Sequence, residues 1–219
     1  MQPRFTLKNW VSLSRKLPML FVLFCLFAGS GVSNAQPYIN GPLSTGATAT
    51  GGTAAPVGFT WSEVQPGNVN AGFTNSVTNG FSLADNFTVP SGQSWSLSKF
   101  TAYAYSTGYA GATSPYTVIR VQIFNTNPST GSPAPIFGDL TTNRFSASST
   151  ASMYRIFNAT PGTTRQIWKI EATVNTVLPS GSYWIEWQLD NGLASNFSPA
   201  KTVVGVQGQA GDNAIQHTM

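Results

Sequence analysis

The chain has 219 residues, with 11 Lys or Arg, seven Asp or Glu, one cysteine and one histidine. Four of the basic residues lie within the first 16 positions and all seven acidic residues follow Ala35, so the part after Ala35 has no formal net charge. Nucleic-acid binding depends on clustered cationic charge. The remaining basic residues are scattered singly, so we expect no nucleic-acid partner.

The first 35 residues have the parts of a cleavable secretory signal peptide. The first 16 are basic and contain no acidic residue, and an apolar run of 12 residues follows at Leu17–Ala28. The small side chains of Ser33 and Ala35 suit a signal peptidase, which predicts a helical signal peptide cleaved between Ala35 and Gln36. A membrane anchor is the alternative, but a spanning helix needs about 20 apolar residues. We therefore expect a secreted chain with no membrane span after signal removal.

The one cysteine, Cys25, lies inside this apolar run. Lipoprotein processing would require a small residue before it, and Phe24 is large, so Cys25 is predicted to be a small hydrophobic residue of the signal peptide. The mature chain is then cysteine-free, which excludes disulfide and thiolate chemistry. Because secreted eukaryotic domains of this size usually carry disulfides, a bacterial source is expected.

Residues 36–56 are predicted to form a flexible leader. They contain Gly41-Pro42 and Gly51-Gly52-Thr53 and few large apolar side chains, so they offer little surface to bury beyond one short edge strand. Residues 57–219 are predicted to form one β-domain. The chain stops at Asp212–Met219 without a closing turn, so we expect this domain to be truncated at its C-terminus.

The clearest predicted strand is 117–124, in which apolar and polar residues alternate. Alternation with a period of two places the apolar side chains on one face of a half-buried strand. Two further segments, 166–174 and 183–189, alternate in the same way. The predicted core-facing residues of the three strands are Ile119, Val121, Ile123, Trp168, Ile170, Ala172, Val174, Tyr183, Ile185, Trp187 and Leu189.

Weaker strand candidates recur along the rest of the domain at intervals of roughly 8 to 15 residues, separated by turn-forming residues. They are 58–61, 82–89, 95–105, 154–158 and 202–206. Apolar residues with sustained helical spacing do not occur among them. The pattern predicts an all-β fold, an antiparallel two-sheet sandwich of the jelly-roll-like kind.

A six-residue pattern, P-S-G-x-x-W, occurs at Pro90–Trp95 and again at Pro179–Trp184. Proline favours an early turn position, and glycine permits the positive φ that reverses a chain. Each copy is therefore predicted to be a turn that joins two separate strands. We interpret the two copies as similar corners of one sandwich.

Catalytic motifs are missing from the mature sequence. Its one histidine, His217, is expected to be solvated, and a serine nucleophile needs a positioned base. Phosphate-binding, metalloprotease and serine-hydrolase motifs do not occur. Asp139, Asp190 and Asp212 lie in apparent turns, where turn formation is a simpler interpretation than calcium binding. We expect no catalytic residue, no metal site and no cofactor.

Two acidic residues could still form a glycosidase pair. Glu171 and Glu186 are predicted on the outward faces of two strands that a turn at Pro179 would join as a hairpin, and glycoside hydrolysis needs two carboxyl groups flanking one bond. The alternative is a solvated face on which Lys169, Glu171 and Glu186 make cross-strand charge pairs. We favour the charge pairs.

Trp184, Glu186 and Gln188 form the predicted ligand-binding site. They alternate along 183–189 and so share the outward face of that strand. An indole can stack on the apolar face of a sugar while the carboxylate and amide pair with its hydroxyls, which makes these residues a candidate saccharide platform. In the alternative interpretation, Trp184 lies beneath a loop or against the leader.

The chain also resembles a family of exported domains. The resemblance rests on 84–95 (ADNFTVPSGQSW), 138–144 (GDLTTNR) and 178–187 (LPSGSYWIEW), and covers most of 81–208. These segments resemble the jelly-roll-like β-sandwich domains of bacterial cell-surface proteins, of the kind found in type IX secretion system cargo. The resemblance implies a non-catalytic module, secreted or at the cell surface, with a structural, adhesive or interaction role and an extracellular glycan or cell-surface protein as its partner. A carbohydrate-binding module and a fragment of a secreted glycan-active enzyme are the alternatives.

Overall fold

The computed structural model describes residues 37–63, 71–158, 160–193, 195–199 and 213–218. The predicted signal peptide, its cleavage site after Ala35 and the predicted strand 202–206 lie outside the described residues. The chain divides into two units, Met1–Asn40 and Gly41–Met219, and the strands named below all lie in the second. Within the described ranges, no helix is long and apolar enough to cross a membrane.

The described part of the chain is all-β, as predicted. Its strands are β1 (Thr60–Ser62), β2 (Gly72–Thr74), β3 (Phe81–Ala104), β4 (Val118–Phe124), β5 (Phe137–Asp139), β6 (Phe145–Arg155), β7 (Gln166–Asp190), β8 (Phe197–Pro199) and β9 (Ile215–Thr218). Each contains the β-branched, aromatic or alternating residues that suit a pleated, half-buried surface.

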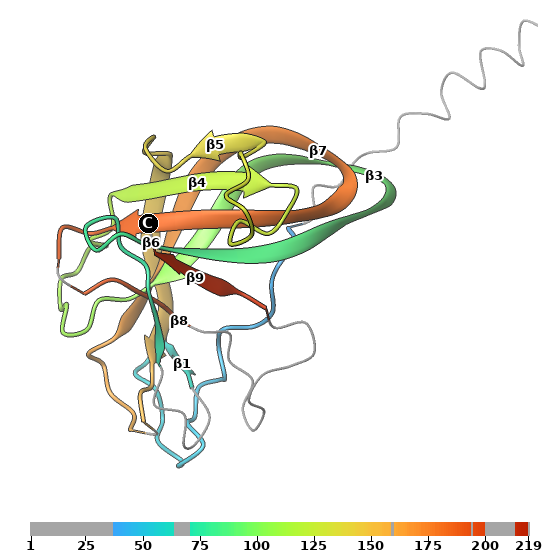
Figure 1. Ribbon diagram of the computed structural model, residues 1–219. Coiled ribbons are helices and arrows are strands. Elements are labelled where there is room, and N and C mark those ends of the chain that lie inside the picture. Colours follow the sequence, from blue (N-terminus) through green and yellow to red (C-terminus); the bar gives the residue numbers. More distant parts are fainter. Residues whose placement is uncertain (1–36, 64–70, 159, 194, 200–212, 219) are drawn as a thin grey trace, which may run out of the picture. The chain divides into compact units, whose positions relative to one another are not determined.

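Seven of these strands form one sheet, in the order β1-β6-β7-β3-β9, with β4 paired to β7 and β5 paired to β4 (Figure 1). β2 and β8 form a second, two-stranded sheet. The β1–β6 pair is parallel, whereas the other pairs are antiparallel. The main sheet is therefore mixed and not purely antiparallel as predicted, because alternation within a strand carries no information about the direction of its neighbour.

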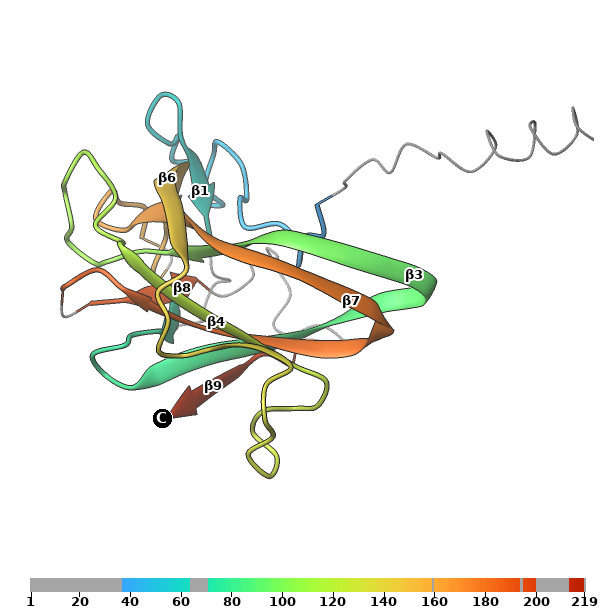
Figure 2. The same cartoon turned by 90° about the horizontal axis from the view of Figure 1, so that it is seen from above.

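β3 and β7 are much longer than the strands predicted for these segments. They span 24 and 25 residues and pair antiparallel along most of their length. Figure 1 and Figure 2 show both strands curving back at the same end of the sheet. The sheet is thus folded over: one half of the β3–β7 ladder pairs with β4 and β9, and the other half pairs with β6.

The two P-S-G-x-x-W segments lie opposite each other at this bend. Val89 pairs with Gly181 and Ser94 pairs with Pro179, and the register shifts between these two pairs. Gly92, inside the irregular stretch, has a φ of 77°, which glycine adopts without steric cost. The prediction that each segment joins two separate strands is therefore wrong. Both are bends within continuous strands, and they bend at the same place because they face each other in one ladder.

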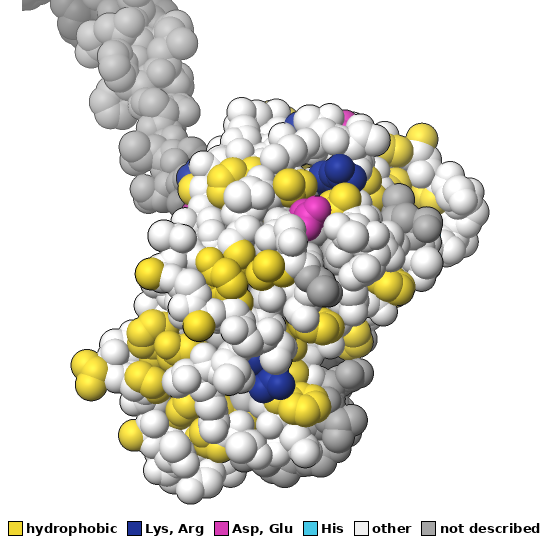
Figure 3. Space-filling view, turned by 90° about the vertical axis from the view of Figure 1, so that its left-hand side faces the viewer, with side chains coloured by type: hydrophobic (Ala, Val, Ile, Leu, Met, Phe, Trp, Pro, Cys, Tyr) yellow, Lys and Arg dark blue, Asp and Glu magenta, His cyan; other side chains and the backbone are white. Residues whose placement is uncertain are grey.

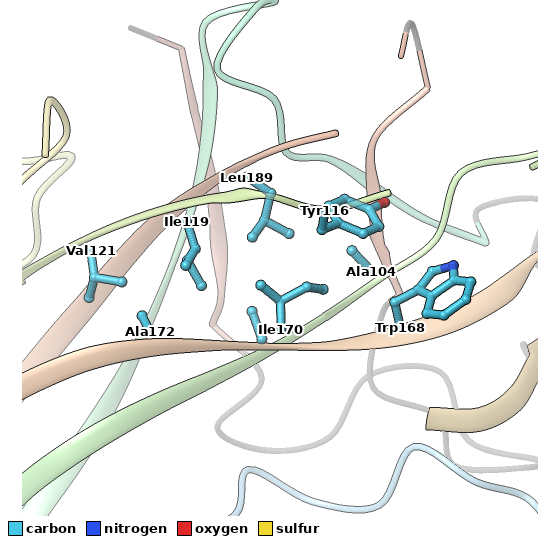
Figure 4. Close-up of a cluster of buried hydrophobic side chains, with 9 residues drawn as sticks. Ala104, Tyr116, Ile119, Val121, Trp168, Ile170, Ala172 and Leu189 are labelled. Carbon is cyan, nitrogen blue, oxygen red and sulfur yellow. The ribbon is translucent and has the colours of Figure 1, made fainter. Parts of the chain in front are cut away.

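Side chains from both halves of the folded sheet enclose the main core. Val121 and Leu189 come from one half, Ile170 and Ala172 come from the other, and all four belong to one buried cluster (Figure 4). A second buried cluster, at the bend, consists of Phe87, Val89, Ile123, Val174, Leu178 and Tyr183. The bend therefore brings two parts of the same ladder together around shared apolar surface.

The predicted core-facing residues are confirmed. Ile119, Val121 and Ile123 are fully buried, and the sets from 166–174 and 183–189 belong to the two clusters or pack against them. Within β7 the core-facing positions are even-numbered before the bend and odd-numbered after it. The irregularity at the bend explains this switch, because a shift of one residue moves the apolar set to the opposite face.

Part of the predicted leader makes defined contacts with β1. The N–H of Thr45 donates to the carbonyl of Trp61 at 2.7 Å, and the N–H of Trp61 donates to the carbonyl of Gly46 at 2.8 Å. The carboxylate of Glu63 accepts the N–H of Thr50 at 2.6 Å, and both Trp61 and Glu63 are buried. The composition of residues 36–56 gives no sign of this anchoring, because Trp61 and Glu63, which provide it, lie outside the leader.

Candidate functional site

The three residues of the predicted ligand-binding site lie on β7, on the face that points away from the main core. Trp184 is partly exposed, but Glu186 is 1% and Gln188 is 3% exposed, and Nε2 of Gln188 donates to the carbonyl of Phe81 at 3.4 Å. The shared face is confirmed, and the predicted exposure of Glu186 and Gln188 is wrong. The reason is that groups from the neighbouring strands contact both side chains: Ser82, Gln122 and His217 lie against Glu186, and Gln188 reaches back to β3. Ligand contact by Trp184 stays a prediction.

Glu186 is the centre of a buried hydrogen-bond cluster that connects four strands. Its Oε1 accepts the hydroxyl of Ser82 from β3 and lies 3.1 Å from Nδ1 of His217 in β9. Its Oε2 accepts Nε2–H of Gln122 from β4 at 2.7 Å. A buried carboxylate is stable only when charge-assisted hydrogen bonds replace its lost hydration. Ser82, Gln122 and His217 supply these bonds, and we call the four residues the Glu186 cluster.

The order of groups in the Glu186 cluster differs from that of a serine-hydrolase triad. In a triad, the imidazole lies between the serine hydroxyl and the carboxylate and takes the serine proton. Here the carboxylate lies between Ser82 and His217, and the hydroxyl donates to Glu186. The arrangement therefore connects strands, and its order of groups is not that of a triad.

His217 is only partly solvated, whereas the sequence predicts a solvated side chain. β9 pairs with the beginning of β3 and places His217 opposite Ser82. A protonated His217 forms an ion pair with Glu186. The sequence holds no local signal for this contact, because the paired segments are distant in the chain and β9 has only four residues.

The glycosidase alternative, in which a hairpin would bring Glu171 close to Glu186, is not what the structure shows. Both residues lie on β7, on opposite sides of its bend, so no hairpin joins them. Glu171 instead accepts hydrogen bonds from Nζ of Lys169 at 2.6 Å and from Nζ of Lys99 at 2.8 Å. These bonds lower the pKa of Glu171 to about 2. The charge-pair interpretation is confirmed in part: Glu171 pairs across strands with Lys99 of β3 and within β7 with Lys169, while Glu186 belongs to the other half of the sheet.

Asp139 uses its carboxylate to close a turn. Its Oδ1 accepts the N–H of Thr141 at 2.8 Å and the N–H of Thr142 at 2.6 Å, and the hydroxyls of both threonines also donate to the carboxylate. These bonds, led by the one from the Thr141 hydroxyl, hold the pKa of Asp139 well below its usual range. The turn interpretation is therefore confirmed for Asp139.

The candidate acidic residues thus lie in three settings: the Glu186 cluster, the lysine pairs of Glu171 and the turn at Asp139. In each setting, the carboxylate accepts hydrogen bonds from the protein's own groups. In the part of the chain that the structure describes, no group of three or more His, Cys, Asp or Glu is placed to hold a metal ion. No family model, curated protein or solved structure matches the chain.

Proposed function

We propose that this protein is a secreted, non-catalytic β-sandwich module of the jelly-roll-like kind, with a structural, adhesive or interaction role outside a bacterial cell. The observation that carries the proposal is the engagement of Asp139, Glu171 and Glu186 in contacts between neighbouring chain segments. A general acid or base must instead reach a substrate proton. Carboxylates held in this way stabilise the fold, and these three form no acid–base pair with one another.

The folded sheet supports the sandwich architecture. Two sheets of a sandwich enclose one core between their inner faces, and the two halves of the folded β3–β7 ladder do the same around one buried cluster. The bend takes the place of a loop between the layers. Exposed positions on the outside of the two layers, such as Val177, are then available as surface for other molecules.

The surface composition supports a role in contacts with uncharged partners. Figure 3 shows a face on which apolar and uncharged polar groups predominate and charged side chains are few. Large apolar side chains such as Val177, Ile136 and Phe73 are exposed. Because charge steers association mainly through clustered potentials, such a surface suits a neutral polymer or a neighbouring protein domain better than a highly charged partner.

The alternative of a carbohydrate-binding module has weaker support. Glu186 and Gln188 are buried and hydrogen-bonded within the sheet, so they are not free to pair with sugar hydroxyls. Trp184 keeps partial exposure and remains the one member of the predicted platform that a ligand could touch. An indole without its polar partners offers stacking but little selectivity among sugars.

The test uses the full chain expressed in a bacterial host. N-terminal sequencing of the purified extracellular protein should give a chain that begins at Gln36. With a panel of polysaccharides and peptides, this protein should release no more product than its Glu186→Gln variant. Cytoplasmic retention of the uncleaved chain would contradict secretion, and hydrolysis that is lost in the Glu186→Gln variant would contradict the non-catalytic role.

A further inference from the structure

A buried polar region lies where the two-stranded sheet β2–β8 meets the ends of β3 and β7. Tyr105, directly after β3, exchanges both backbone hydrogen bonds with Phe197 of β8. Asn75, directly after β2, accepts the N–H of Leu189 of β7 through its Oδ1 at 3.0 Å. Asn75 and Ser198 are themselves buried. The joint between the two sheets therefore holds polar groups away from bulk solvent.

Asn196 adds a primary amide to this region. Its backbone carbonyl accepts the N–H of Asn75 at 3.1 Å, which fixes it beside the end of β2. The residue is 1% exposed, and neither its Oδ1 nor its Nδ2 has a hydrogen-bond partner among the described residues. A primary amide can donate two hydrogen bonds and accept two. Leaving all of them unmade in the interior would destabilise the folded protein.

Ser198 has hydrogen-bonding capacity to spare near Asn196. Its hydroxyl lies 3.5 Å from Nδ2 of Asn75, which is at the outer limit for a hydrogen bond. A serine hydroxyl donates once and accepts twice. Ser198 can therefore bind a further small polar group without losing an existing strong contact.

Tyr116 brings a second buried hydroxyl to the same end of the molecule. Its oxygen makes no hydrogen bond of good geometry and lies close to the side chain of Asn191. Nδ2 of Asn191 donates to the carbonyl of Ser195 at 3.2 Å, the residue before Asn196. Burial raises the pKa of Tyr116, so its hydroxyl is neutral. Tyr116 is thus connected to Asn196 along the chain through Asn191 and Ser195, and it adds an uncharged donor and acceptor to this end of β7.

We propose that Asn196 anchors a buried hydration site, in which one or more ordered water molecules bridge its amide to Ser198 and Tyr116. Water suits this chemistry, because a buried water makes about two to four hydrogen bonds to groups that the protein leaves unpaired. The amide of Asn196 and the hydroxyls of Ser198 and Tyr116 are uncharged, which favours water over a charged ligand. The attachment of β2–β8 to the main sheet is then mediated in part by solvent.

The first test is a high-resolution crystal structure of the exported protein. We expect ordered water within about 2.7 to 3.2 Å of Oδ1 or Nδ2 of Asn196, with a second contact to Ser198 or Tyr116. A dry site, an amide paired directly with protein groups, or density for a larger molecule or an ion would each overturn the proposal.

The second test replaces the amide with an apolar side chain of similar volume. Asn196→Leu removes the anchor of the bridging water, so the folding equilibrium constant should fall roughly ten-fold. Asn196→Ser keeps a polar group, so its folding equilibrium constant should fall less. Asn125→Leu is the matched control, because Asn125 is exposed. If the amide is instead buried dry, Asn196→Leu should raise the melting temperature, and this result would overturn the proposal. If Asn196→Leu does not fold, two other results test the proposal. One is the stability of Asn196→Ser relative to the control, and the other is the crystal structure.

Discussion

Glu186 shows how one carboxylate can connect four strands of a sheet. Ser82, Gln122 and His217 approach it from three different strands, and it is buried on a fourth. Each of these donors would be left facing a poorer acceptor if the negative charge were removed. Glu186, predicted from the sequence to lie on a binding surface, therefore acts as an internal connection between β7, β3, β4 and β9.

A Glu186→Gln substitution should lower the free energy of unfolding by about 1 to 3 kcal/mol. The reason is that the new amide group turns an N–H donor toward groups that are themselves donors. Urea denaturation measures the resulting loss of unfolding free energy. Glu171→Gln is the matched control, because its lysine partners are largely exposed and exposed pairs contribute less than about 1 kcal/mol. Equal losses in the two variants would contradict the role assigned to Glu186.

Glu171 makes stability depend on pH in the acid range. Lys169 and Lys99 lower its pKa from the ordinary 4.5 to about 2, so the unfolded chain takes up the proton first as the pH falls. Its contribution is complete above about pH 4.5 and disappears as the pH falls to about 2. Across this window, the melting temperature of the natural protein should drop more than that of Glu171→Gln. Parallel curves would show that the lysine pairs do not act on this carboxylate.

At the level of elements, the faces of the strands could be predicted and their ends could not. Alternation is local, so the core-facing residues of β4 and β7 follow from the sequence alone. The burial of Glu186 could not be predicted, because it depends on which strands lie beside β7. One of the strands involved, β9, pairs Thr218 with Phe81, and these two residues are far apart in the sequence. For the same reason Pro90 and Gly92 predict a change of direction, but only the segment opposite them decides between a turn and a bend in a continuous strand.

The bend itself can be tested at Gly92. A Gly92→Ala substitution should cost about 1 kcal/mol, because its φ of 77° is strained for a residue with a Cβ atom, although open space surrounds that position. Gly162→Ala is the matched control, since Gly162 has open space and no positive φ. Chemical denaturation should show a loss for the first variant only. Equal stability of the two variants would contradict the backbone conformation at the bend.

At the level of the whole molecule, one ladder supplies both layers of the proposed sandwich. The halves of β3 and β7 face each other across a shared core, so the fold needs no disulfide to hold its layers together. The carboxylates that were candidates for catalysis, those of Glu186, Glu171 and Asp139, instead make hydrogen bonds and ion pairs at the outer faces and turns of the sheet. The proposed structural or adhesive role follows from that use, and it depends on the ladder being continuous through the bend.

Backbone NOEs from the isotopically labelled protein test this continuity most directly. We predict contacts between Phe87 and Tyr183 on one side of the bend and between Ala102 and Ile170 on the other, since both are partners in one antiparallel ladder. Contacts between Val89 and Trp95 as cross-strand partners, in place of these, would show that the segment folds back as a hairpin and would contradict the folded-over sheet.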